Sequence, residues 1–90
     1  MDRLLTLEMF VAVAGEGGFA AAARKLGHSP PAVTRGIAAL EDRLGTSLFH
    51  RSTRAVVLTD AGAAFLGEAR RILGDLAGAE RAVRGAAAEP

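Results

Sequence analysis

A helix-breaking turn at Gly27-His28 constrains the fold of this 90-residue chain more than any other feature. Apolar residues recur at helical spacing from Phe19 to Leu26, and glycine then suits the left-handed conformation that ends helices. Directly after the turn, Ser29 is a good N-cap, and Pro30 can take the first helical position, where its missing N–H costs nothing. The sequence therefore predicts two short helices joined by a tight turn.

The second helix of this pair is expected to have one apolar side. The residues that recur at i, i+4, i+7 and i+11 are apolar and are expected to be buried: Val33, Ile37, Leu40 and Leu44. At about 100° per residue, Arg35 points away from that stripe, with Pro31 and Thr34 beside it. Such a pair is typical of a helix-turn-helix, in which the start of the second helix enters the major groove of DNA. The alternative is an ordinary helical hairpin.

Positive charge is concentrated around this turn. The net charge of +1 does not by itself argue for nucleic acid. Between positions 24 and 54, however, six basic residues stand against two acidic ones, a local charge of +4. Cysteine is absent, which excludes disulfides and thiol chemistry, and the two histidines have no spaced partners for a metal site or a catalytic triad. We expect no enzyme, no metal site and no membrane-spanning run, and a cytoplasmic location.

The first helix is expected to be apolar on two sides. Asp2 can cap it, Leu7 and Phe10 lie on one face, and Leu5 and Met9 lie on a second face. A helix with two apolar faces in so small a protein is expected to be covered twice, once by its own domain and once by another helix or subunit.

A change of period after Gly45 predicts a small hairpin. Two short extended runs, from 48 to 51 and from 55 to 58, are separated by the polar residues Ser52, Thr53 and Arg54. Beside a helix-turn-helix such a hairpin is a wing, and an arginine at its tip suits a phosphate or the minor groove. A solvated turn is the alternative.

The rest of the chain predicts one long helix. Thr59-Asp60 is a good helix start, and the pattern continues to about Gly85, roughly 27 residues or about 40 Å. Its apolar residues alternate spacings of four and three, as in a coiled-coil seam, which indicates a partner helix, most simply from a second copy. The residues expected to form the dimer surface are Leu5, Met9, Phe65, Ala69, Ile72, Leu73, Leu76 and Val83.

Nearly the whole chain resembles the DNA-binding domain of LysR-type transcriptional regulators. The residues that carry the resemblance are Phe10-Val11-Ala12-Val13, Gly18-Phe19, Ala22-Ala23, Leu26, Ser29, Pro31-Ala32-Val33, Arg35, Ile37, Leu40-Glu41, Leu44-Gly45, Leu48-Phe49, Arg51, Thr53-Arg54, Leu58-Thr59 and Gly62. The resemblance implies a mainly α winged helix-turn-helix at 1–58 and a linker helix with a frayed tail at 59–90, paired antiparallel in a homodimer. It also implies an absent C-terminal domain that binds a small-molecule effector, no cofactor in this fragment, and a tetrameric full-length protein.

The resemblance also implies which residues touch DNA. Pro31, Thr34 and Arg35 are expected to face the major groove of a double-stranded operator, and Thr53 and Arg54 to serve the wing. The full expected set is Ser29, Pro30, Pro31, Thr34, Arg35, Arg51, Ser52, Thr53 and Arg54. The chain departs from the family at Pro30, where glutamine is usual, because proline offers a base only apolar contact, such as to a thymine methyl.

Two other interpretations remain open at this point. One is a helical dimerisation or protein-interaction module, which the coiled-coil seam favours and which has no need of the local charge of +4. The other is the related N-terminal domain of molybdate-responsive regulators.

Overall fold

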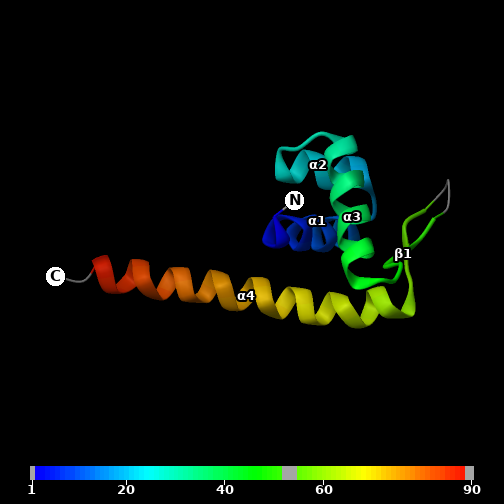
Figure 1. The fold of residues 1–90 in the computed structure, drawn as a ribbon. Coiled ribbons are helices and arrows are strands. Elements are labelled where there is room, and N and C mark those ends of the chain that lie inside the picture. Colours follow the sequence, from blue (N-terminus) through cyan, green and yellow to red (C-terminus); the bar gives the residue numbers. More distant parts are fainter. Residues whose placement is uncertain (1, 52–54, 89–90) are drawn as a thin grey trace.

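Four helices and a two-stranded antiparallel ribbon make up the part of the chain described by the computed structural model, residues 2–51 and 55–88. In order they are α1 (Arg3–Glu16), α2 (Phe19–Leu26), α3 (Pro30–Leu44), β1 (Phe49–His50), β2 (Val57–Leu58) and α4 (Asp60–Ala88). The first three helices form a bundle, the ribbon projects from one side of it, and α4 runs past the bundle and extends well beyond it (Figure 1). The molecule measures 54 × 25 × 21 Å as a result.

Side-chain caps and left-handed glycines set the helix boundaries. Asp2 accepts a hydrogen bond from the Leu4 N–H at the start of α1, and Ser29 accepts one from the Ala32 N–H at the start of α3. Gly17, Gly27 and Gly45 end α1, α2 and α3 with φ between 72° and 79°, a conformation that costs glycine little. The predicted turn between α2 and α3 is therefore confirmed.

The core lies where α1, α2 and α3 meet, and aromatic rings extend it towards the ribbon and α4. Val33 and Ile37 of α3 are fully buried against α1, as predicted. The ring centroid of Phe10 lies 5.4 Å from that of Phe49 in β1 and 5.4 Å from that of Phe65 in α4. Phe10 thus ties the bundle, the ribbon and the last helix to one another.

Three predictions about buried residues are wrong. Leu44 was expected in the core but is 42% exposed, because it lies at the end of α3, where it lines an open groove together with residues of α1 and α4. Met9 and Ala69 were expected to face a second subunit, but they are 1% and 0% exposed inside the core of the single chain. Ala69 lies on α4, which packs against α1 within the same chain, and Met9 belongs to the same buried core.

The ribbon is shorter and the last helix longer than the sequence predicts. Each strand has two residues instead of four, with Phe49 opposite Leu58 and His50 opposite Val57. The predicted tip of the wing, residues 52–54, lies outside the described residues. Helix α4 continues past Gly85 to Ala88, because the alanines that follow are good helix formers and nothing stops the helix at the glycine. No helix among the described residues has the length and apolarity needed to cross a bilayer.

Candidate nucleic-acid interface

The outward face of α3 presents the major-groove residues predicted from the sequence. Pro30, Pro31, Thr34 and Arg35 are all exposed, while the opposite side of the helix is buried. Within the described part of the chain, the Arg35 guanidinium makes no ion pair and no hydrogen bond. A fixed cation at the surface of a rigid helix is suited to a phosphate or to the edge of a guanine. Whether these side chains touch DNA stays a prediction.

The start of α3 has few groups left for hydrogen bonding. Ser29 Oγ accepts from the Ala32 N–H at 3.2 Å, as its predicted capping role requires. Thr34 Oγ1 donates to the Pro30 carbonyl at 3.1 Å, one turn back along the helix. The two prolines have no N–H at all. The first turn is therefore rigid and mostly carbon on its exposed side.

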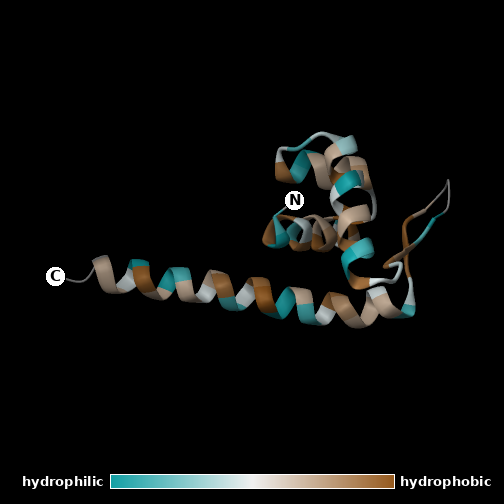
Figure 2. Cartoon of the chain, in the orientation of Figure 1, coloured by the Kyte–Doolittle hydropathy of each residue, from teal (hydrophilic) through white to brown (hydrophobic). Residues whose placement is uncertain are grey.

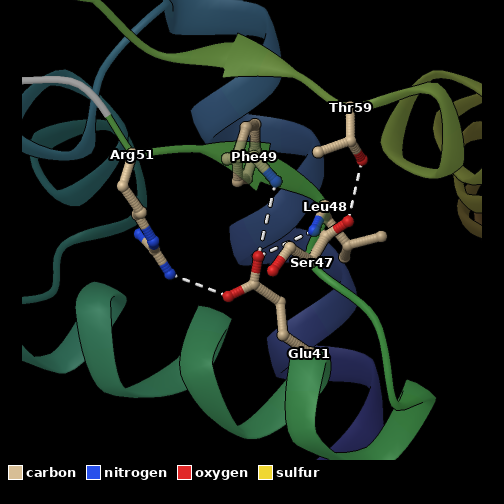
Figure 3. A network of polar contacts seen from close by, with 6 residues as sticks. All are labelled: Glu41, Ser47, Leu48, Phe49, Arg51 and Thr59. Carbon is tan, nitrogen blue, oxygen red and sulfur yellow. Dashed lines mark hydrogen bonds and ion pairs between the residues drawn. The ribbon is translucent and has the colours of Figure 1, made fainter.

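A carboxylate that the sequence analysis named only for the family resemblance, that of Glu41, holds the base of the wing against α3 (Figure 3). Glu41 Oε2 accepts from the backbone N–H of Leu48 at 2.7 Å and of Phe49 at 3.4 Å, and Oε1 accepts from Arg51 at 2.7 Å. The Glu41 side chain is only 12% exposed. Spacing rules do not predict this network, because the three partners of Glu41 lie across a loop whose course such rules do not determine.

Arg51 also belongs to this network. Besides its ion pair with Glu41, its guanidinium carbon lies 5.7 Å from the centroid of the Phe19 ring, a cation–π arrangement. Arg51 thus has partners within the protein, although its side chain remains 54% exposed. Its predicted DNA contact stays a prediction, as do those of Ser52, Thr53 and Arg54, which lie outside the described residues.

Part of the apolar surface that is left exposed lies along α4, from Ile72 to Val83. Figure 2 shows hydrophobic positions recurring along α4 beyond the bundle. Ile72, Leu76 and Val83 are exposed, the last by 69%. Leu5, Phe65 and Leu73, also predicted for the dimer surface, are half-buried and packed on the core. A groove of about 400 Å³ beside them is lined by Arg3, Leu4, Leu7, Leu40, Arg43, Leu44, Phe65 and Ile72.

A charged face accompanies this apolar one. Arg71 pairs with Glu68 at 2.6 Å and with Asp75 at 3.7 Å, all on α4. The hydrogen bond and charge of Glu68 raise the pKa of Arg71, with Asp75 adding to the effect. The guanidinium is charged at neutral pH in any case, so the cluster keeps this side of α4 solvated without making it sensitive to pH.

Comparison with known proteins identifies this arrangement. Residues 4–63 match the family described as "Bacterial regulatory helix-turn-helix protein, lysR family". The chain belongs to the lysR family. Its bundle, turn and ribbon are the winged helix-turn-helix of that family, as the sequence predicts. The family match also favours this interpretation over the molybdate-responsive alternative.

Individual relatives agree with the family match. TfdS of Cupriavidus pinatubonensis (strain JMP 134 / LMG 1197), an HTH-type transcriptional regulator, is 61% identical over 67 residues, which are 74% of this chain and 23% of TfdS. The crystal structure of the CbnR_DBD-DNA complex has a TM-score of 0.86 at 46% identity and covers 97% of this chain and 99% of that one. The BenM_DBD/catB site 1 DNA complex has a TM-score of 0.92 at 33% identity and covers 100% and 99%. The chain thus spans about a quarter of the regulator it matches.

Proposed function

We propose that this lysR-family domain binds double-stranded DNA sequence-specifically, as the DNA-reading part of a longer bacterial transcriptional regulator. The observation that carries the proposal is the exposed Arg35 guanidinium, which projects from the face of α3 opposite the buried Val33 and Ile37. Structural neighbours that contain DNA, the CbnR_DBD and BenM_DBD complexes, support it.

The mechanism separates affinity from specificity. Cations around α3 and the wing neutralise phosphates and release counterions, which supplies affinity that falls with salt. Arg35 in the major groove donates two hydrogen bonds to O6 and N7 of a guanine, which supplies specificity. The wing, with Thr53 and Arg54, contacts the minor groove or the backbone.

A homodimer is the second part of the proposal. The exposed Ile72, Leu76 and Val83 lie on one helix that extends beyond the bundle, and a matching helix from a second copy would cover them. Two reading heads held in this way would recognise two half-sites at a fixed spacing.

The remaining functions are assigned to the rest of the regulator. Because this chain spans 23% of TfdS, we assign small-molecule effector binding and tetramer assembly to the part of the regulator that follows this domain. We assign this domain no cofactor and no catalytic role, in keeping with relatives that are transcriptional regulators, and we place the protein in the cytoplasm with the nucleoid.

Selection from a random double-stranded DNA pool, at near-physiological salt, tests the proposal. Two enriched half-sites at a fixed spacing are expected, and one enriched half-site would support reading by a weakly associated dimer. Retention without enrichment, lost as salt rises, would contradict specific binding. That last result would favour the competing function, a helical interaction module, for which the exposed apolar side of α4 is the supporting observation.

A further inference from the structure

The first turn of α3 offers no backbone N–H to a ligand. Pro30 and Pro31 have none, the Ala32 N–H donates to Ser29 Oγ at 3.2 Å, and the Val33 N–H donates to the Ser29 carbonyl at 3.2 Å. The start of a helix usually presents several unsatisfied N–H groups, and these bind phosphates and other acceptors. Residues 30–33 therefore cannot hold DNA through their backbone in that way.

Side chains add no donor to this turn either. The Thr34 hydroxyl donates its hydrogen to the Pro30 carbonyl at 3.1 Å, so its oxygen remains only as an acceptor. The exposed rings of Pro30 and Pro31 are hydrocarbon. Pro30, Pro31 and Thr34 thus leave no free donor on the exposed side of the first turn, and Arg35 is the next residue after Ser29 that can donate.

Such a surface discriminates among base edges. Purine N7, guanine O6 and thymine O4 are acceptors, and an acceptor pressed against a proline ring loses its water and gains no partner. The one apolar group that the four bases show in the major groove is the C5-methyl of thymine. We propose that Pro30 reads a C5-methylated pyrimidine by apolar contact. This rests on the proposed function and names the base chemistry that the first turn recognises.

The position of the methyl relative to the Arg35 contact follows from the helix. Pro30 packs beside Thr34, one residue before Arg35, and five residues of α-helix rise about 7.5 Å. With about 3.4 Å per base pair along DNA, the methyl lies within about two base pairs of the base that Arg35 reads. The two contacts are close enough to fall in one half-site and far enough apart to be scored separately.

The test removes single methyl groups from a duplex obtained by selection. Each thymine of one half-site is replaced in turn by deoxyuridine, which keeps the pairing with adenine and loses only the methyl. One replacement within two base pairs of the Arg35 position is expected to raise Kd about fourfold, the factor for burying one methylene-sized group. Exchanging cytosine for 5-methylcytosine at that position is expected to lower Kd by a similar factor, with guanine opposite in both duplexes.

Variants assign the effect to Pro30. Pro30→Ala and Pro30→Gln are each expected to reduce the uracil-to-thymine ratio of Kd values from about four towards one, and helicity by circular dichroism shows that the fold is retained. Arg35→Ala is the matched control, since it is expected to weaken binding to both duplexes and to leave their ratio near four.

Each contrary result has a distinct meaning. If no single methyl changes Kd by more than about twofold, or if both Pro30 variants keep the ratio, the inference is overturned while selective DNA binding stands. If the selection yields no enriched sequence, the proposed function fails and the inference fails with it.

Discussion

Arg35 combines a predictable direction with an unsatisfied charge. Its direction follows from the 100° step of a helix whose opposite residues, Val33 and Ile37, are apolar, so the sequence predicts its exposure correctly. Because Arg35 has no ion pair or hydrogen bond among the described residues, its guanidinium is available to distinguish one base from another.

Replacing Arg35 by alanine is therefore expected to cost about 1 to 3 kcal/mol on the selected DNA site and to relax specificity at one position. Kd on selected and random duplexes at one salt concentration measures this. Arg43→Ala, at the other end of the same helix, is the control and is expected to spare the discrimination between the two duplexes. Equal losses on both duplexes for Arg35→Ala would show a phosphate contact instead.

Arg51 and Arg54 are the two arginines assigned to the wing. Arg51 is paired with Glu41, while Arg54 lies outside the described residues and is assigned to the wing tip from sequence. Arg54→Ala is expected to weaken binding and to lower the slope of log K against log salt by about 1, because one phosphate contact is lost. Arg51→Ala is expected to change the slope less. A slope unchanged by Arg54→Ala would identify that residue as a solvated turn residue.

The elements show what sequence determines and what it leaves open. Caps and turn glycines are local, so Asp2 and Ser29 set the starts of α1 and α3, and three glycines set the ends of α1, α2 and α3. Apolar periodicity predicts that one face of a helix is buried, but it does not predict which element buries it. For that reason the sequence assigns Met9 and Ala69 to a partner subunit. The hydrogen bonds of Glu41 to the wing depend on the course of a loop, which apolar periodicity does not predict.

Glu41 is expected to be needed for the attachment of the wing to α3. Glu41→Ala removes the acceptor for two backbone N–H groups and one guanidinium, at an expected cost of about 1 to 3 kcal/mol in the free energy of unfolding. Hydrogen exchange at the Leu48 and Phe49 amides is expected to accelerate by more than the global loss requires. The neighbouring, exposed Asp42→Ala is the control. Unchanged exchange at both amides in Glu41→Ala would contradict the role.

Gly62 marks the closest approach of α4 to the wing. A Cβ at Gly62 would overlap the Leu48 carbonyl oxygen, which is fixed by a 3.0 Å hydrogen bond from the Thr59 N–H. Gly62→Ala is therefore expected to destabilise the fold by about 1 to 3 kcal/mol. Gly74→Ala, in an open part of the same helix, is expected to stabilise it by about 0.5 to 1 kcal/mol. Thermal unfolding distinguishes the two variants. Equal shifts in Tm would show that the backbone at Gly62 and Leu48 moves apart at little cost.

On the scale of the whole molecule, the exposed apolar residues of α4 are the surface that a single chain leaves uncovered. Leu76→Glu is expected to shift the protein from dimer to monomer, because a carboxylate would be buried in the apolar contact between copies. Gly74→Glu introduces the same side chain on the other side of the helix and is expected to leave the dimer intact. Sedimentation velocity measures both. A monomeric unsubstituted chain, or a dimer that tolerates Leu76→Glu, would contradict the assignment.

The close contact at Gly62 has a mechanical consequence. At that contact α4 lies directly against the base of the wing, and its 29 residues span about 44 Å. A tilt of about 5° at one end displaces the other by about 4 Å, more than the spacing of one base pair. In a dimer, a small rotation between the two α4 helices would therefore move the two helix-turn-helix domains out of register with the grooves of DNA.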